Sequence, residues 1–255
     1  MIQQEAANWR SLGFHAEAAY IYNNAVTVVP EDDLLRFRLH ENFFEAGWYS
    51  RVLRGFRGPF RQYLQRGGNG LPDKFWELAY LKPEPFREFI GKHGLKNGIP
   101  PALITAMMRQ ESNFHPRARS HAGAVGLMQL LPSVGRRLGS SAGYGNVTTA
   151  RLYDPDINIA LGTVFLAGNL GRYNGNIPLA ISCYNADPRN LPAWLERSHS
   201  EREDSFDLDL FIELIPLEET YDYNLQVLTN FWRYQEVYGE HEDLFKWKLS
   251  SSNRR

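Results

Sequence analysis

The chain lacks several features that would place it quickly in a class of proteins. Its one cysteine is Cys183, so neither an intramolecular disulfide nor a cysteine-based zinc site can form. No run approaches the roughly 18 apolar residues that a membrane-spanning helix needs. The start, Met1–Glu5, has neither the basic nor the apolar stretch of a secretory signal. The sequence therefore predicts no integral membrane segment, and either a cytoplasmic protein or a processed or truncated piece.

An excess of charge is also missing. The 28 Lys and Arg residues nearly balance the 29 Asp and Glu residues, which leaves a net charge of −1. Nucleic acids and anionic membranes are bound largely by clustered basic residues, so this balance argues against both as partners. The seven histidines have no metal-ligand spacing, and the sequence has no glycine loop of a nucleotide site. We therefore expect no metal, no cofactor and no nucleic acid.

What the chain does have is helical periodicity, broken at proline and glycine, over 255 residues of which 43% are apolar. This pattern predicts an all-α protein with one large domain or two modest ones. The best boundary lies at residues 81–85, where Pro83 and Pro85 disfavour helix and stiffen a connector. We therefore expect domains at residues 1–84 and 85–255, the second with a frayed, basic C-terminal end.

The first predicted domain carries the spacing of a helical repeat. Its residues Ala18, Tyr22, Ala25 and Pro30 match the second helix of a tetratricopeptide unit. Any helical hairpin explains the same pattern, and this alternative stays open. A helical repeat buries its apolar face only against neighbours, so the repeat interpretation also predicts further helices upstream. One or two more helices are expected over residues 34–53.

A lone acid stands on an apolar helical face in the second predicted domain. Ile104, Met107 and Glu111 share this face, since they lie three and four residues apart. The pair His115–Pro116 should terminate the helix, which puts the acid in its last turn, at the negative end of the helix dipole. The dipole and the apolar face both disfavour the charged carboxylate. We therefore predict a raised pKa and a general-acid role for Glu111; the alternative is a glutamate that simply reaches water.

A segment rich in small residues follows over residues 120–129. Its glycines and alanines let the backbone approach another group closely, and Gln129 offers both donors and an acceptor. This composition is typical of the wall of a binding cleft. A tight connection between two helices gives the same pattern, so both interpretations stay open.

Four motifs in this order resemble those of the soluble lytic transglycosylases. The first is Glu111–Ser112, and the second is Gly126–Gln129 with the sequence GLMQ. The third is Cys183–Ala186 with the sequence CYNA. The fourth is residues 212–223, which contain the sequence IELIP, the pair Glu219–Thr220 and Tyr223. The resemblance covers about residues 85–238. It implies a lysozyme-like helical catalytic domain. The helical part before it resembles the end of the superhelix that precedes this domain in larger members.

The resemblance also implies an activity. Members of this family cleave the β-1,4 bond between N-acetylmuramic acid and N-acetylglucosamine in peptidoglycan without water, and they leave a 1,6-anhydromuramyl end. Glu111 is then the catalytic acid, which protonates the glycosidic oxygen and later, as a carboxylate, helps to remove the C6 hydroxyl proton. The substrate-binding residues implied in the same way are Ser112, Ser120, Met128, Gln129, Tyr184, Asn185, Glu213 and Tyr223.

Three positions depart from the family pattern. Cys183 stands where alanine is usual, Asp187–Pro188 where Gly-Pro is usual, and Leu131 where methionine is common. Asp187 adds a charge near the expected cleft and is expected to alter subsite preference. None of these changes removes a group that the chemistry requires.

Two other functions remain as alternatives. A hydrolytic muramidase on the same scaffold would usually need a second carboxylate, for which Glu213, Glu218 and Asp187 are candidates. A non-catalytic cell-wall-binding protein would keep the fold without turnover. Glycan strands of peptidoglycan are the expected partner in each case, which implies the periplasm or cell envelope as location. Because the sequence has no export signal, a mature or truncated chain is expected.

Overall fold

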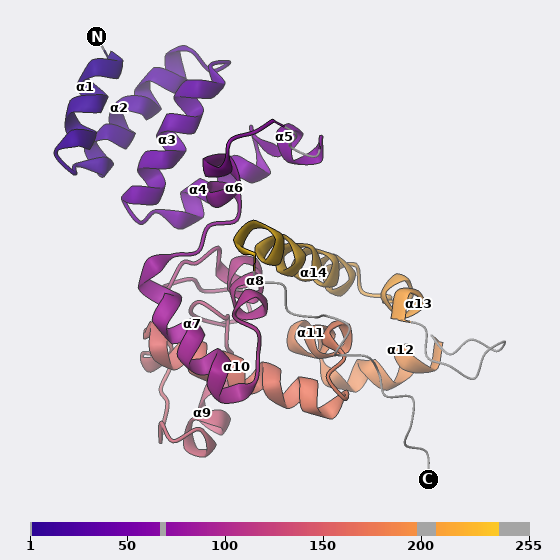
Figure 1. Ribbon diagram of the computed structural model, residues 1–255. Helices are drawn as coiled ribbons and strands as arrows, with labels where there is room; N and C mark the ends of the chain where they lie inside the picture. Colours follow the sequence, from indigo (N-terminus) through magenta and orange to yellow (C-terminus); the bar gives the residue numbers. More distant parts are fainter. Residues whose placement is uncertain (1, 67–69, 198–207, 240–255) are drawn as a thin grey trace. The chain divides into compact units, whose positions relative to one another are not determined.

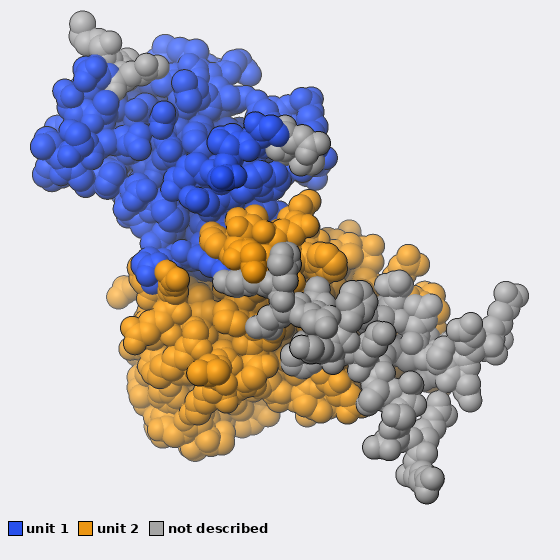
Figure 2. Space-filling model, viewed as in Figure 1, with its two compact units in different colours: residues 1–84, 113–115 blue, residues 85–112, 116–255 orange. Residues whose placement is uncertain are grey.

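The computed structural model describes residues 2–66, 70–197 and 208–239, which are helical apart from loops and two isolated β-bridges (Figure 1). The prediction of an all-α fold is confirmed. The chain divides into two compact units, residues 1–84 with 113–115 and residues 85–112 with 116–255 (Figure 2). Among the described residues, no helix has the length and apolar character needed to cross a membrane. The expected basic C-terminal end lies outside the described residues.

The first unit begins with a helical hairpin. Gly13, with φ at +80°, turns the chain between the first two helices. Ala18, Tyr22 and Ala25 lie on the buried face of the second helix, as the spacing predicted. The assignment of this unit to the end of a superhelix stays a prediction. Its helices are α1 (Ile2–Ser11), α2 (His15–Val28), α3 (Asp33–Glu45), α4 (Tyr49–Arg57), α5 (Arg61–Gln65) and α6 (Asp73–Ala79), of which α3 and α4 fill the span 34–53.

Aromatic rings form the core of the first unit. The ring of His40 lies 6.4 Å from that of Phe56 and 5.3 Å from that of Phe60, centroid to centroid. Burial lowers the pKa of His40, and its Nδ1 lies 2.7 Å from the carbonyl oxygen of Arg36. A neutral ring that donates through Nδ1 satisfies both observations. Position 55 must be glycine, because a Cβ there would lie 1.9 Å from the ring nitrogen Nε2.

One of the two prolines at the boundary behaves differently from the prediction. Helix α7 (Glu84–Asn97) already begins at Glu84, so Pro85 lies in its first turn and not in a stiff connector. Proline is accepted there because the N–H groups of a first turn have no partner within the helix. The non-helical connector is residues 80–83.

The second unit is built around α8 (Pro101–Ser112). The sequence predicted one apolar face for this helix, whereas the structure buries every residue from Ala102 to Arg109. Helix α14 packs along α8 and also against α11, so the end of α8 is reached from two other helices (Figure 1). The remaining elements are α9 (Pro132–Ser141), η1 (Arg151–Tyr153), α10 (Pro155–Arg172), α11 (Ile177–Asn185), η2 (Pro188–Asn190), α12 (Leu191–Arg197), α13 (Leu208–Glu213) and α14 (Glu218–Tyr238).

Side-chain caps fix the starts of α10 and α11. Asp154 Oδ1 accepts a hydrogen bond from the backbone N–H of Ile157 at 3.2 Å, and Pro155 follows it, as the sequence predicted. Asn176 Oδ1 accepts from the N–H of Leu179 at 3.0 Å in the same way. Each cap satisfies an N–H group that has no partner within its helix. The two helices are thereby fixed at their N-terminal ends.

Helix α8 stops earlier than its predicted terminator. It ends at Ser112, and the next two residues, Asn113 and Phe114, have φ values of +49° and +61°. Left-handed backbone cannot continue a right-handed helix, so the chain turns away before it reaches the pair His115–Pro116. Glu111 therefore lies in the last turn of α8, as predicted.

Candidate active site

The acid at the end of α8 meets a tyrosine from α14. The hydroxyl of Tyr223 donates a hydrogen bond to Glu111 Oε1 at 2.5 Å and also lies 3.5 Å from the sulfur of Met107. Tyr223 is only 5% exposed, and 112 positions separate it from the acid in the sequence. Packing of α14 on α8 brings the two together. Because Oε1 accepts the tyrosine proton, the second carboxyl oxygen, Oε2, can carry the acid's own proton.

The surroundings of Glu111 favour its protonated form. Burial raises the pKa of Glu111 to about 7; the hydrogen bond from Tyr223 acts in the opposite direction, and the negative charge of Glu219 adds to the increase. Glu219 lies one turn before Tyr223 on α14. The raised pKa agrees with the sequence prediction. A carboxyl with a pKa near 7 can both give and take a proton near neutral pH.

A second tyrosine near this carboxyl comes from α11. Burial and the charge of Glu111 raise the pKa of Tyr184 well above its usual value, so the phenol keeps its proton. Its hydroxyl donates that proton to the carbonyl oxygen of Met128 at 2.9 Å. The ring packs against Phe165 with centroids 5.0 Å apart. With its proton engaged, the phenolic oxygen of Tyr184 has lone pairs to offer to a positive charge.

A buried asparagine holds the loop of residues 120–129 in place. Asn158, on α10, accepts a hydrogen bond from the N–H of Met128 at 2.7 Å. Its amide nitrogen donates to the carbonyl oxygens of Val125 at 3.0 Å and Leu152 at 2.7 Å. All the polar atoms of this side chain are thus used to fix the backbone of the loop. The carbonyl that holds Tyr184 is part of that backbone.

Two of the residues predicted to bind substrate have buried side chains that support the loop. The side chain of Ser112 is buried, and its Oγ donates to the carbonyl oxygen of Leu127 at 2.8 Å. The side chain of Met128 is also buried, and it packs so closely on Gly162 that a Cβ there would lie 2.3 Å from the sulfur. Neither side chain faces solvent. Both side chains support the loop, and contact of either residue with a substrate stays a prediction.

Three other predicted residues are more accessible. Ser120 is half-buried, and its Oγ accepts from the N–H of Ala124 at 3.0 Å. Gln129 is also half-buried and donates from Nε2 to the carbonyl oxygen of Gly126 at 2.8 Å, which leaves its Oε1 as an acceptor. Glu213 is exposed at the end of α13. Binding of a sugar by these three residues stays a prediction.

Sequence reasoning did not name Glu219 as the second carboxylate, whose charge raises the pKa of Glu111. Glu219 has this role through its charge, whereas Asp187, one of the candidates for a second acid, forms an exposed ion pair with Arg189 at 2.5 Å. The signal that could have found Glu219 is its spacing, since residues four apart on a helix share one face and Tyr223 follows at that distance. The spacing alone does not predict that α14 packs on α8.

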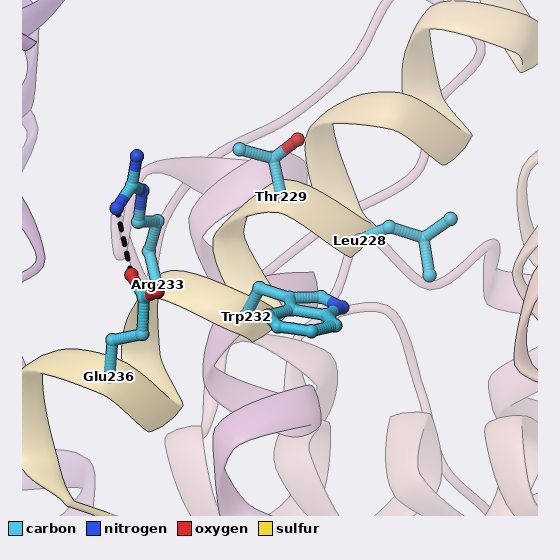
Figure 3. A pocket seen from close by; sticks show the side chains of 5 residues that line it. All are labelled: Leu228, Thr229, Trp232, Arg233 and Glu236. Atoms are coloured by element: carbon cyan, nitrogen blue, oxygen red, sulfur yellow. Dashed lines mark hydrogen bonds and ion pairs between the residues drawn. The ribbon is translucent and has the colours of Figure 1, made fainter. Parts of the chain in front are cut away.

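A hollow on the surface of α14 is separate from this site. It has a volume of about 360 Å³ and is lined by Leu228, Thr229, Trp232, Arg233 and Glu236 (Figure 3). Arg233 Nη1 donates to Glu236 Oε2 at 2.7 Å within it. Tyr223 lies on the buried face of α14, whereas Trp232 is 53% exposed. The hollow therefore belongs to the outer face of the helix.

Comparison with known proteins finds a domain-family match over the part of the chain that contains Glu111 and Tyr184. Residues 88–206 match the family model described as "Transglycosylase SLT domain". Over 171 residues the chain is 30% identical to the soluble lytic murein transglycosylase of Escherichia coli strain K12, an alignment that covers 66% of this chain and 26% of that protein. The chain thus spans about a quarter of the length of this relative.

Solved structures agree on the fold. A lytic transglycosylase Slt from Pseudomonas aeruginosa, solved as an inactive mutant, matches with a TM-score of 0.69 and 26% identity, covering 93% of this chain and 35% of that chain. The 70-kDa soluble lytic transglycosylase of Escherichia coli matches with a TM-score of 0.69 and 22% identity, covering 93% of this chain and 36% of that chain. The lysozyme-like, all-α fold predicted from the sequence is confirmed.

Proposed function

We propose that the transglycosylase SLT domain of this chain cleaves the β-1,4 bond between N-acetylmuramic acid and N-acetylglucosamine in peptidoglycan and forms 1,6-anhydromuramyl ends. One observation carries the proposal: a carboxyl group at the end of a buried helix, with its pKa raised to about 7 and one oxygen held by Tyr223. Such a carboxyl suits a reaction in which one group is first an acid and then a base. The envelope, where peptidoglycan lies, is the proposed place of action.

In the first step Glu111 acts as an acid. Its proton, carried on Oε2, passes to the glycosidic oxygen while the bond from that oxygen to C1 of N-acetylmuramic acid breaks. The released N-acetylglucosamine then carries a C4 hydroxyl, and positive charge develops at C1 and the ring oxygen. The lone pairs of the Tyr184 hydroxyl, whose proton is engaged by Met128, are suited to stabilise that charge.

In the second step the same residue acts as a base. The C6 hydroxyl oxygen of N-acetylmuramic acid attacks C1, and its proton goes to the Glu111 carboxylate. The new C1–O6 bond closes the 1,6-anhydro ring, and the enzyme regains its starting protonation state. Water takes no part, so the scheme needs no second carboxylate as a nucleophile or to activate water. Donation by Tyr223 stabilises Glu111 in the charged form that exists between the two steps.

The test is digestion of purified sacculi followed by mass analysis of the soluble products. Anhydro ends are expected, each one water lighter than the corresponding reducing end. Reducing ends would instead establish hydrolysis, the second candidate function, for which the charge of Glu219 near Glu111 is the specific observation. Binding to sacculi with no soluble product would favour the non-catalytic alternative.

The Tyr223→Phe variant is expected to move the alkaline limb of the pH–activity profile upward by about one pH unit. The hydrogen bond from Tyr223 lowers the pKa of Glu111, so its loss raises that pKa and keeps the acid protonated to higher pH. The rate at neutral pH is expected to fall about tenfold, since the charged carboxyl loses its partner. The measurement is product release as a function of pH. Tyr221→Phe, on the same helix, is the control, and an unmoved limb in the Tyr223 variant would contradict the assignment.

A further inference from the structure

Helices α11 and α14 are joined by two side-chain hydrogen bonds, one above the other. Thr220 Oγ1 donates to Asn185 Oδ1 at 2.8 Å, and Asn224 Nδ2 donates to Ser182 Oγ at 2.9 Å. The partners are three residues apart on α11 and four apart on α14, so each pair shares a helix face. Asn185 ends α11 directly after Tyr184. The Thr220 pair is therefore the one next to the candidate active site.

The hydroxyl proton of Thr220 requires an acceptor. Thr220 is 2% exposed, and a buried hydroxyl without a hydrogen bond is costly. It is the third residue of α14, and the carbonyl oxygen of the N-cap Leu217, three residues behind it, already accepts from the N–H of Tyr221 at 2.9 Å. Asn185 Oδ1 is the acceptor that the structure provides. This requirement fixes which end of the Asn185 amide faces Thr220.

The other end of the amide then faces away from the buried threonine. Asn185 is half-buried, whereas Thr220 lies in the core. With Oδ1 turned toward Thr220, the two N–H donors of Nδ2 point away from it and stay free for a ligand. Amide donors there match the carbonyl of an N-acetyl group on a sugar.

We propose that Thr220 is a positioning residue, which holds the Asn185 amide so that its N–H donors face the N-acetylated sugar beside Glu111. The proposal rests on the proposed function. Thr220 touches no substrate in this scheme and acts through Asn185. Without its hydroxyl nothing holds Oδ1 inward, and the amide can turn its oxygen instead of its N–H donors toward the sugar carbonyl.

The experiment measures binding apart from turnover. A tetrasaccharide of alternating N-acetylglucosamine and N-acetylmuramic acid is titrated calorimetrically into the full chain carrying Glu111→Gln. In that background, Thr220→Val is expected to weaken binding about fivefold, which corresponds to one lost hydrogen bond. Thr220→Ser restores the hydroxyl and is expected to bind within twofold of the parent. Thermal unfolding of each variant checks that it is folded.

Two further variants separate positioning from a structural role. Asn185→Ala is expected to weaken binding as much as Thr220→Val, and the double variant no further, because Thr220 acts only through Asn185. Ser182→Ala removes the other link between α11 and α14 and is expected to leave binding within twofold. Unchanged binding by Thr220→Val, additive losses in the double variant, or an equal loss in Ser182→Ala would each overturn the proposal.

A failure of the proposed function gives a different result. In that case wild type releases no anhydro product from sacculi, whether or not the parent Glu111→Gln chain binds the tetrasaccharide. Binding by the parent together with an unaffected Thr220→Val variant overturns only the role of Thr220.

Discussion

Glu111→Gln is expected to lower the release of anhydro products from sacculi by about 10³-fold or more. Glutamine has nearly the same shape and keeps an oxygen that can accept from Tyr223, but it can neither give nor take a proton. General acid–base catalysis contributes about 10²–10⁴-fold in enzymes, and here one carboxyl serves both steps. Product release from purified sacculi, followed by mass analysis, measures the loss. Activity within tenfold of wild type would remove Glu111 from the mechanism.

The same variant is expected to be more stable than wild type at alkaline pH. The folded-state pKa of Glu111 is raised to about 7 from the usual 4.5, so folding favours the protonated form. This contribution is complete below pH 4.5 and is lost as the pH rises through about 7. Above that range wild type holds a desolvated carboxylate, and glutamine relieves a cost on the order of 3 kcal/mol. Denaturant titrations at acidic and alkaline pH measure the free energy of unfolding of both proteins. If the difference between the variant and wild type does not grow with pH, the desolvation of Glu111 is contradicted.

Gly126→Ala is the second change with a large expected effect. Gly126 has φ at +84°, and a Cβ there would lie 2.2 Å from Asn158 Nδ2 and 2.6 Å from the carbonyl oxygen of Leu152. Left-handed strain and the clash together are expected to cost about 3 kcal/mol, or a fall in Tm of roughly 10 °C. Activity is expected to fall as well, because displacement of Asn158 releases the backbone of Met128 that holds the tyrosine of α11. Calorimetry and the sacculus assay measure the two effects.

Gly123→Ala provides a matched control in the same loop. Gly123 has φ at +82°, so it carries nearly the same left-handed strain, but no atom lies within 4 Å of its added Cβ. It is expected to cost about 1 kcal/mol and to leave the product rate within a few-fold of wild type. The difference between the two variants isolates the contact with Asn158. Equal losses would show that backbone strain, and not this contact, sets the requirement for glycine.

Local patterns in the sequence were sufficient for most of the helices and for the raised pKa of Glu111. Asp154–Pro155 predicts the start of α10, because an N-cap and a proline act within a few residues of each other. The position of Glu111 in a last helical turn, among apolar neighbours, predicts a raised pKa in the same local way. The same local reasoning was wrong at Pro85, which enters a first helical turn, and at His115, which the helix does not reach.

Tertiary packing decided what surrounds the acid. Tyr223 follows Glu111 by 112 positions, and nothing in either segment encodes that α14 packs along α8. The place of Met128 in the loop likewise depends on α10, whose Asn158 accepts from the N–H of Met128. Helix period and caps depend on residues a few positions apart, so the sequence by itself determined the elements and the place of Glu111 in a last helical turn. Desolvation and hydrogen-bond partners depend on segments far apart in the chain, so only the assembled fold determined the environment in which the acid works.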